Sequence, residues 1–371
     1  MFPPELHEYF GFWYNRRMAI VFFCRLFYPH IGGVEKHVLE ISKILIKKGH
    51  KIIVFTEQYD PKLKLHEKIE GISIYRIPAG KNERFKKFEI WKNLWKHRKI
   101  IEKADIIHCH DVFFWYLPFR FLYFKKPVFT TFHGYESYPI PKKALIMRKV
   151  SEELSNGNIC VGEFMKKWYG TKPTYTTYGG VRILPINTNT TNKYQSKKNI
   201  QLLFIGRLDQ QTGIMRYLKA VKILKDKGYI FDLDVLGDGE QRQDAEKFCS
   251  KFNLNVRFHG FVNNTTDFLE KANYVFVSRY LGILEAMASK KLVFALYDNP
   301  LKEDYLKMTP FAKLVNIVNS EKHLANKVLY FLKNSEKEKE MIGKAFDWSK
   351  NQSWENAVRT YIKLWQTKID L

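Results

Sequence analysis

Four short stretches of this chain carry the glycines, arginine and carboxylates that could bind an anion. They are Gly32-Gly33-Val34-Glu35 in the first half and, in the second, Gly206-Arg207-Leu208-Asp209, Gly237-Asp238-Gly239 and Leu284-Glu285-Ala286-Met287-Ala288. Each follows or flanks an apolar run of strand type, so that backbone N–H groups and the positive end of a following helix can hold a phosphate there. Such stretches in both halves favour an enzyme that uses a nucleotide-activated substrate.

Strand-like runs alternate with helical patterns along the chain, which predicts βα units and parallel sheets. The expected strands are 19–25, 51–56, 72–77, 106–110, 128–133 and 157–161, then 201–205, 231–236, 256–258, 274–277 and 292–295. The polar stretch 184–199 reads as a linker. We therefore expect an α/β protein with two doubly wound domains, 18–183 and 200–350, after an N-terminal extension, 1–17. The folded part is expected to start near Met18.

The composition narrows the class of protein. The chain has 371 residues, enough for two domains with their own cores, and its 45% hydrophobic and 27% charged residues are ordinary for a globular protein. No run approaches the roughly 18 apolar residues that a membrane span needs. The 4 cysteines lack metal-type or paired spacing, so we expect a reducing, cytoplasmic location.

The net charge of +24 favours an anionic partner. The lysines are spread over most of the expected helices, and no nucleic-acid-binding signature is present, so we expect no nucleic-acid partner. Contact with the inner face of a membrane and a merely lysine-rich composition both remain open.

Taken in order, these stretches resemble the family-4 retaining glycosyltransferases of the GT-B fold, from Met18 to the C-terminus. Further support comes from Asp105-Ile106-Ile107-His108-Cys109-His110, Thr130-Thr131-Phe132-His133-Gly134, Gly260-Phe261-Val262 and Ser353-Trp354-Glu355-Asn356-Ala357. The resemblance implies two Rossmann-like domains with parallel sheets facing across a cleft, and a last helix, 351–371, that completes the first domain. It further implies an acceptor in the N-terminal domain, often lipid-linked, and a nucleotide-diphosphate sugar, UDP- or GDP-linked, in the C-terminal domain. No metal or further cofactor is expected.

The resemblance also implies roles for single residues. Arg207 would contact the diphosphate and offset charge on the leaving group. Glu285 would accept hydrogen bonds from the ribose hydroxyls, since two carboxylate oxygens suit a diol; a helix-start acid favoured by the dipole is the alternative. The implied donor-side residues are Gly32, Gly33, Gly206, Arg207, Thr212, Arg216, Gly237, Asp238, Val262, Gly282, Ile283 and Glu285.

On the acceptor side, the resemblance places His133 near the sugar or the reacting centre, which makes it a catalytic candidate with Arg207 and Glu285. Glu35, His37 and His110 are the other acceptor-side candidates. A histidine at the end of a strand is also often purely structural.

Two departures from the family pattern stand out. The family places a lysine shortly after the arginine, but this chain reads Gln210-Gln211-Thr212-Gly213 there; Arg216 is the substitute we expect. The family also has an earlier glutamate, separated by seven residues from the one that matches Glu285, but the corresponding position here is Val277. Aligned instead from Ser278, Leu281-Gly282 takes the place of the family's Glu-Gly, and the loop is about four residues shorter. These departures keep two rivals open: a catalytically weakened GT-B protein that acts as a scaffold, and a nucleotide-sugar epimerase.

Three further patterns have competing interpretations. Asp232-Leu233-Asp234 imitates a metal-binding motif, but it enters an expected strand and is read as structural. His108-Cys109-His110-Asp111 has metal-type side chains, but neighbours on a strand point to opposite faces, so no metal site is expected. The helix expected near 84–101 carries Phe85, Phe88, Trp91 and Trp95 among lysines and arginines. That pattern suits either a membrane surface or packing on the domain itself.

Overall fold

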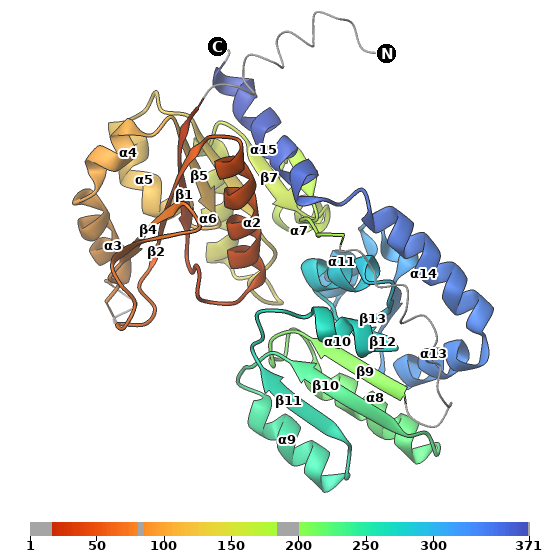
Figure 1. The fold of residues 1–371 in the computed structure, drawn as a ribbon. Helices are drawn as coiled ribbons and strands as arrows, with labels where there is room; N and C mark the ends of the chain where they lie inside the picture. Colours follow the sequence, from red (N-terminus) through yellow and green to blue (C-terminus); the bar gives the residue numbers. More distant parts are fainter. Residues whose placement is uncertain (1–16, 81–84, 184–199, 370–371) are drawn as a thin grey trace, which may run out of the picture. The chain divides into compact units, whose positions relative to one another are not determined.

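The computed structural model describes residues 17–80, 85–183 and 200–369, and it divides into two compact units (Figure 1). Unit 1 consists of Met1–Val161, Met165–Thr177 and Trp354–Leu371, and unit 2 of Gly162–Phe164 and Tyr178–Ser353. The expected linker, 184–199, and residues 1–16 of the expected extension lie outside the described residues.

Unit 1 is built on an 8-stranded sheet in the order β3-β4-β2-β1-β5-β6-β7-β8. Its strands are β1 (Ala19–Cys24), β2 (Lys51–Glu57), β3 (His66–Ile69), β4 (Ile72–Ile77), β5 (Ile106–His110), β6 (Val128–Phe132), β7 (Asn158–Val161) and β8 (Tyr175–Thr177). All pairs are parallel except β3 with β4. The central strands are buried along nearly their whole length, as a sheet covered on both faces requires.

The helices of this unit are α2 (Gly33–Lys47), α3 (Lys86–Trp95), α4 (Arg98–Lys103), α5 (Phe113–Leu122), α6 (Lys142–Leu154), α7 (Phe164–Tyr169) and α15 (Trp354–Ile369). The last of them, α15, comes from the far end of the chain and packs on α2 (Figure 1). The single helix expected near 84–101 is wrong in its extent, because α3 ends at Trp95 and α4 begins at Arg98.

Unit 2 is built on a 6-stranded parallel sheet in the order β11-β10-β9-β12-β13-β14. Its strands are β9 (Ile200–Ile205), β10 (Phe231–Leu236), β11 (Val256–Gly260), β12 (Tyr274–Phe276), β13 (Leu292–Leu296) and β14 (Asn316–Val318). Its helices are α8 (Ile214–Asp226), α9 (Arg242–Lys251), α10 (Thr266–Lys271), α11 (Tyr280–Ala288), α12 (Pro300–Lys307), α13 (Glu321–Lys333) and α14 (Ser335–Ser349), with a 3₁₀ turn at Ala312–Leu314.

Both sheets have a point where the strand order reverses. In unit 1 it lies between β1 and β5, and in unit 2 between β9 and β12. Ligands of open α/β sheets bind beyond the carboxyl ends of the strands at such switch points. The segments after these four strands are therefore where a site is expected on fold grounds alone, and they begin at Arg25, Asp111, Gly206 and Val277.

Candidate functional site

In unit 2, the candidate residues begin with the turn that follows β9. Gly206 N–H donates to Leu236 O at 3.0 Å and Leu208 N–H to Asp238 O at 2.9 Å, so this turn lies directly on the one that follows β10. A Cβ on Gly237, whose φ is +137°, would lie 1.9 Å from Gly206 O, and one on Gly239 would lie 2.5 Å from Leu208 O. These two glycines are therefore required by the close backbone contact between the turns.

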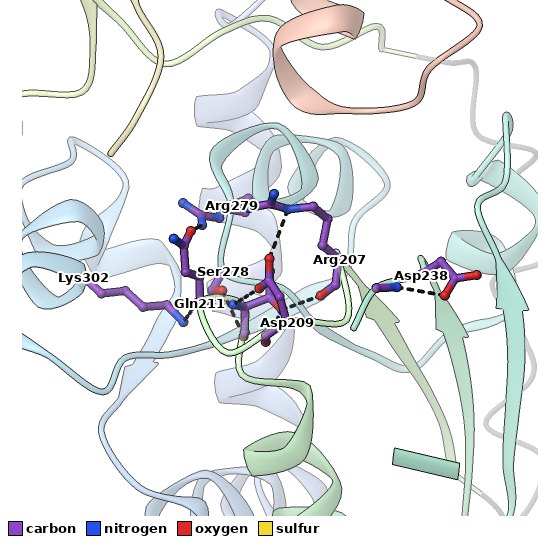
Figure 2. A network of polar contacts seen from close by, with 9 residues as sticks. Arg207, Asp209, Gln211, Asp238, Ser278, Arg279 and Lys302 are labelled. Carbon is purple, nitrogen blue, oxygen red and sulfur yellow. Dashed lines mark hydrogen bonds and ion pairs between the residues drawn. The ribbon is translucent and has the colours of Figure 1, made fainter. Parts of the chain in front are cut away.

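Arg207 projects from this turn (Figure 2). Its side chain is 61% exposed, and its Nε lies 3.2 Å from Asp209 Oδ2. Thr212 closes the turn from the other end: its hydroxyl donates to the carbonyl oxygens of Arg207 and Asp209, and its N–H donates to Asp209 Oδ1 at 2.8 Å. The backbone under Arg207 is thus fixed while the guanidinium faces solvent. Thr212 itself is buried and stabilises the turn through these hydrogen bonds.

Asp238, on the neighbouring turn, is held by its own surroundings. Its Oδ1 accepts from Gly239 N–H at 2.8 Å and its Oδ2 from Arg242 at 2.9 Å. Val262, two residues beyond β11, is half-buried. These two predicted donor residues lie just beyond the carboxyl ends of β10 and β11.

The Arg216 guanidinium, the predicted second cation, has partners of its own. It donates to Glu321 at 2.9 Å, to Tyr297 O at 2.8 Å and to Asn319 O at 2.7 Å. These contacts tie α8 to the segments that follow β13 and β14. The position of Arg216 along the helix was predictable, but the direction of its side chain was not.

Glu285 lies on α11, at the other side of the switch point. It is half-buried, and Thr265 Oγ1 donates to its Oε2 at 3.5 Å. Because α11 begins at Tyr280, Glu285 is in the body of the helix. The alternative reading, a helix-start acid stabilised by the dipole, is therefore excluded.

The start of α11 also corrects the prediction for Ile283. Its N–H donates to Arg279 O at 2.9 Å, and its side chain is fully buried, so neither group can meet a phosphate. Gly282 is inside the first turn, where a Cβ would lie 2.6 Å from Val277 Cγ2. The first-turn N–H groups of α11 belong to residues 280–282. That of Tyr280 donates to the Tyr305 hydroxyl at 3.2 Å, and those of Leu281 and Gly282 have no acceptor within the helix.

In unit 1, the candidate residues begin with the loop between β1 and α2. Gly32 caps α2 in an extended conformation, and a Cβ there would lie 2.3 Å from Glu35 Oε2. The Glu35 carboxylate therefore lies against Gly32, and its Oε1 is 3.0 Å from His30 Nδ1. Gly33 is the first residue of α2, so the helix N-terminus is at this loop, as the sequence predicts.

A chain of hydrogen bonds connects His37 on α2 with the C-terminal helix. Trp365 Nε1 donates to His108 Nδ1 at 3.0 Å, His108 Nε2 lies 2.7 Å from Thr131 Oγ1, and Tyr361 OH lies 2.9 Å from both Thr131 Oγ1 and His37 Nε2. Burial lowers the pKa of His37 to about 3 and that of His108 well below its usual value, so both are neutral at pH 7.

The direction of this chain follows from the donors. Tryptophan can only donate, so the proton of neutral His108 is on Nε2 and is donated to Thr131. The Thr131 hydroxyl then donates to Tyr361, and Tyr361 donates to His37, which is the arrangement that gives every hydrogen a partner. His37 therefore carries its own proton on Nδ1.

His133 and His110 lie beside His37. His110 Nδ1 is 2.8 Å from His133 Nε2, and the His37 and His133 rings are 4.9 Å apart. Burial lowers the pKa of both His110 and His133 well below the usual value. The backbone N–H of His133 donates to Asp111 Oδ1 at 2.9 Å, and Arg148 holds the next residue through Gly134 O at 3.1 Å. Among the described residues, His110 Nε2 is buried without a hydrogen-bond partner.

The structure thus brings the predicted residues together in two groups. His37, His110 and His133 meet after β5 and β6 and at the start of α2, with Gly32, Gly33 and Glu35 in the loop that leads to α2. Gly206, Arg207, Thr212, Gly237 and Asp238 lie in the two stacked turns of unit 2, and Gly282, Ile283 and Glu285 lie on α11. Sequence reasoning missed Tyr361 and Trp365 in unit 1. It also missed Arg279 and Lys302 in unit 2, whose side chains contact the turn after β9.

The two motifs that imitate metal sites have other partners. Asp234 is paired with Arg257 at 2.8 Å, His259 at 2.7 Å and Gln201 at 2.6 Å, and Asp232 accepts from Asn255. His108 is part of the chain to Tyr361, and Cys109 is buried on β5. These side chains stabilise their own sheets.

Two family models match the sequence. Residues 31–176 match Glycosyltransferase Family 4 and residues 187–348 match Glycosyl transferases group 1. An uncharacterized glycosyltransferase of Methanocaldococcus jannaschii is 25% identical over 93% of this chain and 97% of its own length. A Campylobacter jejuni enzyme, GalNAc-alpha-(1->4)-GalNAc-alpha-(1->3)-diNAcBac-PP-undecaprenol alpha-1,4-N-acetyl-D-galactosaminyltransferase, is 24% identical over 85% of this chain and 89% of its own.

Solved structures give the fold. Sucrose-phosphate synthase from Thermosynechococcus elongatus superimposes with a TM-score of 0.77 at 16% identity, covering 95% of this chain and 100% of that one. WaaG, a glycosyltransferase involved in lipopolysaccharide biosynthesis, gives 0.68 at 15% identity, with 93% and 99% covered. The chain therefore has the GT-B fold and belongs to the glycosyltransferases that the Family 4 and group 1 models describe.

Proposed function

We propose that this glycosyltransferase takes a sugar from a nucleotide-diphosphate sugar, UDP- or GDP-linked, and transfers it to an acceptor hydroxyl with retention of configuration. The observation that carries the proposal is the switch point of unit 2. An exposed arginine on a rigid turn follows β9, and a helix N-terminus and a half-buried carboxylate follow β12. Retention and the donor class come from the family resemblance, and the geometry of unit 2 is compatible with them.

Arg207 would bind the donor diphosphate. An arginine makes charge-assisted, often bidentate contacts to phosphate, and these strengthen as negative charge builds on the departing diphosphate. The first-turn N–H groups of α11 add to the same potential. Because these groups can stabilise the leaving group, we propose a reaction that needs neither a metal ion nor a further cofactor, and activity retained in excess EDTA tests this.

Glu285 would accept hydrogen bonds from the ribose hydroxyls of the donor, and the three histidines of unit 1 would face the acceptor. As neutral imidazoles, His37, His110 and His133 can each donate or accept a hydrogen bond to a sugar hydroxyl without carrying charge. His133 is the member that we place at the reacting centre. The departing diphosphate oxygen would help to remove the acceptor proton.

A lipid-linked or polysaccharide acceptor is the class we favour. The printed name of the Campylobacter relative describes an undecaprenol-linked acceptor, and WaaG is described as involved in lipopolysaccharide biosynthesis. We propose surface-glycan assembly as the setting, with a cytoplasmic protein that reaches such an acceptor at a membrane surface.

The decisive experiment is a calorimetric screen of the purified protein against UDP, GDP, ADP, CMP and their common sugars without metal. We expect one base to be selected. Glu285→Gln should then weaken that donor by about tenfold, since a hydrogen bond to a charged group contributes about 1.5 kcal/mol or more. Glu336→Gln, at an 85% exposed side chain on α14, is the control. Unchanged donor affinity in Glu285→Gln would remove the ribose role.

The rival reading is a donor-binding scaffold without turnover. It is favoured by the absence of the family lysine at 210–213 and of the earlier glutamate, which Val277 replaces. Selective donor binding with no transfer and no slow donor hydrolysis would favour this reading. Sugar turnover, with or without an acceptor, would count against it.

A surface of unit 1 supports the membrane setting. Phe85, beside α3, with Phe88 and Trp95 on α3, and Phe121, Leu122 and Phe124 at the end of α5, are each between 47% and 68% exposed, and α3 packs on α5. We call these six the aromatic patch. Lys87, Arg98 and Lys125 lie 5.0, 5.5 and 5.8 Å from the rings of Phe88, Trp95 and Phe124. The other part of the expected stripe is internal: Trp91 donates to Phe114 O at 2.8 Å, and Ile90 and Leu94 are buried.

We propose that the aromatic patch lies on an anionic membrane, with rings at the headgroup level and cations on the lipid phosphates. No helix within the described ranges is long and apolar enough to cross a bilayer. Phe121→Ser with Phe124→Ser should lower binding to vesicles with anionic lipid at least tenfold, and added salt should lower wild-type binding. Ile230→Ser, an exposed apolar residue of unit 2, is the control. Equal binding of the double variant, or salt-insensitive binding, would contradict the proposal.

A further inference from the structure

The turn after β9 lacks the lysine that the family carries, yet two cations from other elements contact that turn. They are Arg279, the residue before α11, and Lys302, in the first turn of α12 (Figure 2). In sequence they are 68 and 91 residues from Gln211, the turn residue that both of them contact. Neither is part of the pattern from which the donor site was predicted.

Lys302 contacts the turn from its buried side. Its Nζ donates to Gln211 O at 2.5 Å and is 4.0 Å from the place where a Cβ of Gly213 would be. The residue is only 2% exposed. It also stands in the first turn of a helix, where the dipole disfavours a cation. A buried lysine in such a place costs stability unless a negative charge compensates it.

Arg279 contacts the side chain of the same turn residue, Gln211, and is half-buried. Its guanidinium donates to Gln211 Oε1 at 2.7 Å, and the ring of Tyr305 is 5.7 Å away. Because α11 begins directly after Arg279, its side chain leaves the backbone where the first-turn N–H groups of that helix start. The short connection between β12 and α11 thus places a guanidinium where the family has a longer loop.

Charged groups of both signs act on the Lys302 side chain. Burial is the main reason why its pKa falls to about 7; Arg279 and Arg216 lower it further, while Asp298 and Asp209 act in the opposite direction. Asp209 is itself paired with Arg207. Arg207, Arg279 and Lys302 thus lie around one turn, where Asp209 and Asp298 are the acidic groups that act on Lys302. A bound anion would favour the protonated form of this lysine.

We propose that Arg279 and Lys302 together replace the missing family lysine. Arg279 contacts the donor diphosphate beside Arg207, and the charge of Lys302 supports the turn from its buried side. This inference rests on the proposed function, because it assumes that a nucleoside diphosphate is the ligand. It assigns the specificity for the diphosphate to residues that the family pattern does not contain.

The test is calorimetric titration with UDP, GDP and ADP, and with the free nucleoside of whichever of these binds. Arg279→Gln should weaken the diphosphate 10- to 100-fold, as expected for a lost charge-assisted contact of about 1.5–3 kcal/mol, and should leave the nucleoside unchanged. Lys307→Met, on the exposed side of α12 where Lys307 pairs with Glu303, is the matched control. Wild-type diphosphate affinity in Arg279→Gln would overturn the inference and leave the proposed function intact. Failure of the wild-type protein to bind any nucleoside diphosphate would overturn both.

A second readout separates charge from shape at Lys302. At pH 8 this lysine is mostly neutral in the free protein, and a bound anion raises its pKa, so that the wild-type complex should take up a proton. Titrations in buffers of different ionisation enthalpy measure this uptake. Lys302→Met, which keeps an unbranched side chain in the same place, should abolish it and weaken the diphosphate. Equal uptake in Lys302→Met would remove Lys302 from the site.

Discussion

The turns of unit 2 and the histidine cluster of unit 1 occupy the same place in two similar sheets but are built in opposite ways. In unit 2 the backbone makes the shape: Gly237 and Gly239 let two turns touch, and the charged side chains stand on them. In unit 1 the side chains make the shape: neutral imidazoles are buried and fixed by a hydroxyl chain from α15. The comparison shows charged side chains on turns shaped by the backbone in unit 2, and neutral, buried side chains linked by hydrogen bonds in unit 1.

The largest effect is expected from Gly237→Ala, which tests whether the close backbone contact shapes the two turns of unit 2. The new Cβ would lie 1.9 Å from Gly206 O in a backbone conformation that L-residues rarely adopt, so we expect a loss of roughly 3 kcal/mol or more in the free energy of unfolding. Gly228→Ala is the matched control, because its φ is also positive, +84°, with nothing within 4 Å of the Cβ. It should cost only about 1–2 kcal/mol. Equal losses in chemical denaturation would show that the contact between the turns does not matter.

The next effect is expected from Arg207→Ala, which tests whether charge acts on the donor side. Turnover should fall about 100-fold, equivalent to about 2.7 kcal/mol of transition-state stabilisation. The melting temperature should hardly change, because the side chain is 61% exposed. Arg207→Lys should restore part of the rate. A folded Arg207→Ala enzyme with the wild-type rate would remove Arg207 from the mechanism.

Tyr361→Phe tests whether buried side chains shape the histidine cluster of unit 1. Losing one hydroxyl leaves Thr131 and His37 without their buried partner, which should lower the free energy of unfolding by about 1–3 kcal/mol. It should also raise KM for the acceptor more than KM for the donor. Tyr330→Phe, an exposed tyrosine on α13, is the control. If donor and acceptor KM change equally, the chain does not serve the acceptor half.

The smallest expected effect is the change in the free energy of unfolding per pH unit. The pKa of His37 is about 3 in the folded chain and near 6.5 when unfolded. The unfolded state therefore binds the extra proton between these values, and stability falls as the pH falls below about 6.5. Each such histidine contributes up to about 1.4 kcal/mol per pH unit. Denaturant titrations from pH 7 to pH 4.5 should show a smaller slope for His37→Gln and an unchanged one for the exposed His323→Gln. A wild-type slope in His37→Gln would contradict a neutral, buried His37.

Much of the fold follows from local pattern. The buried strands were predicted because continuous apolar runs between glycines and polar turns are typical of parallel sheets. The strands β3, β8 and β14 were missed. In β3, His66–Ile69, three polar residues precede a single isoleucine, and the strand forms only the antiparallel edge. The helix expected near 84–101 was continuous in its pattern, but α3 and α4 pack separately, with Lys96 and His97 between them.

The sequence by itself determined that two βα sheets would form and that glycine turns, Arg207 and Glu285 would follow particular strands. These properties depend on residues close together in the chain: alternating strand and helix periods, and glycines where the backbone makes close contacts. Only the tertiary structure decided where side chains point. It turned Arg216 toward Glu321, brought Lys302 to a turn 91 residues away, and joined Tyr361 to His37 across 324 residues. Such contacts depend on how helices pack on a sheet, which spacing along the chain does not specify.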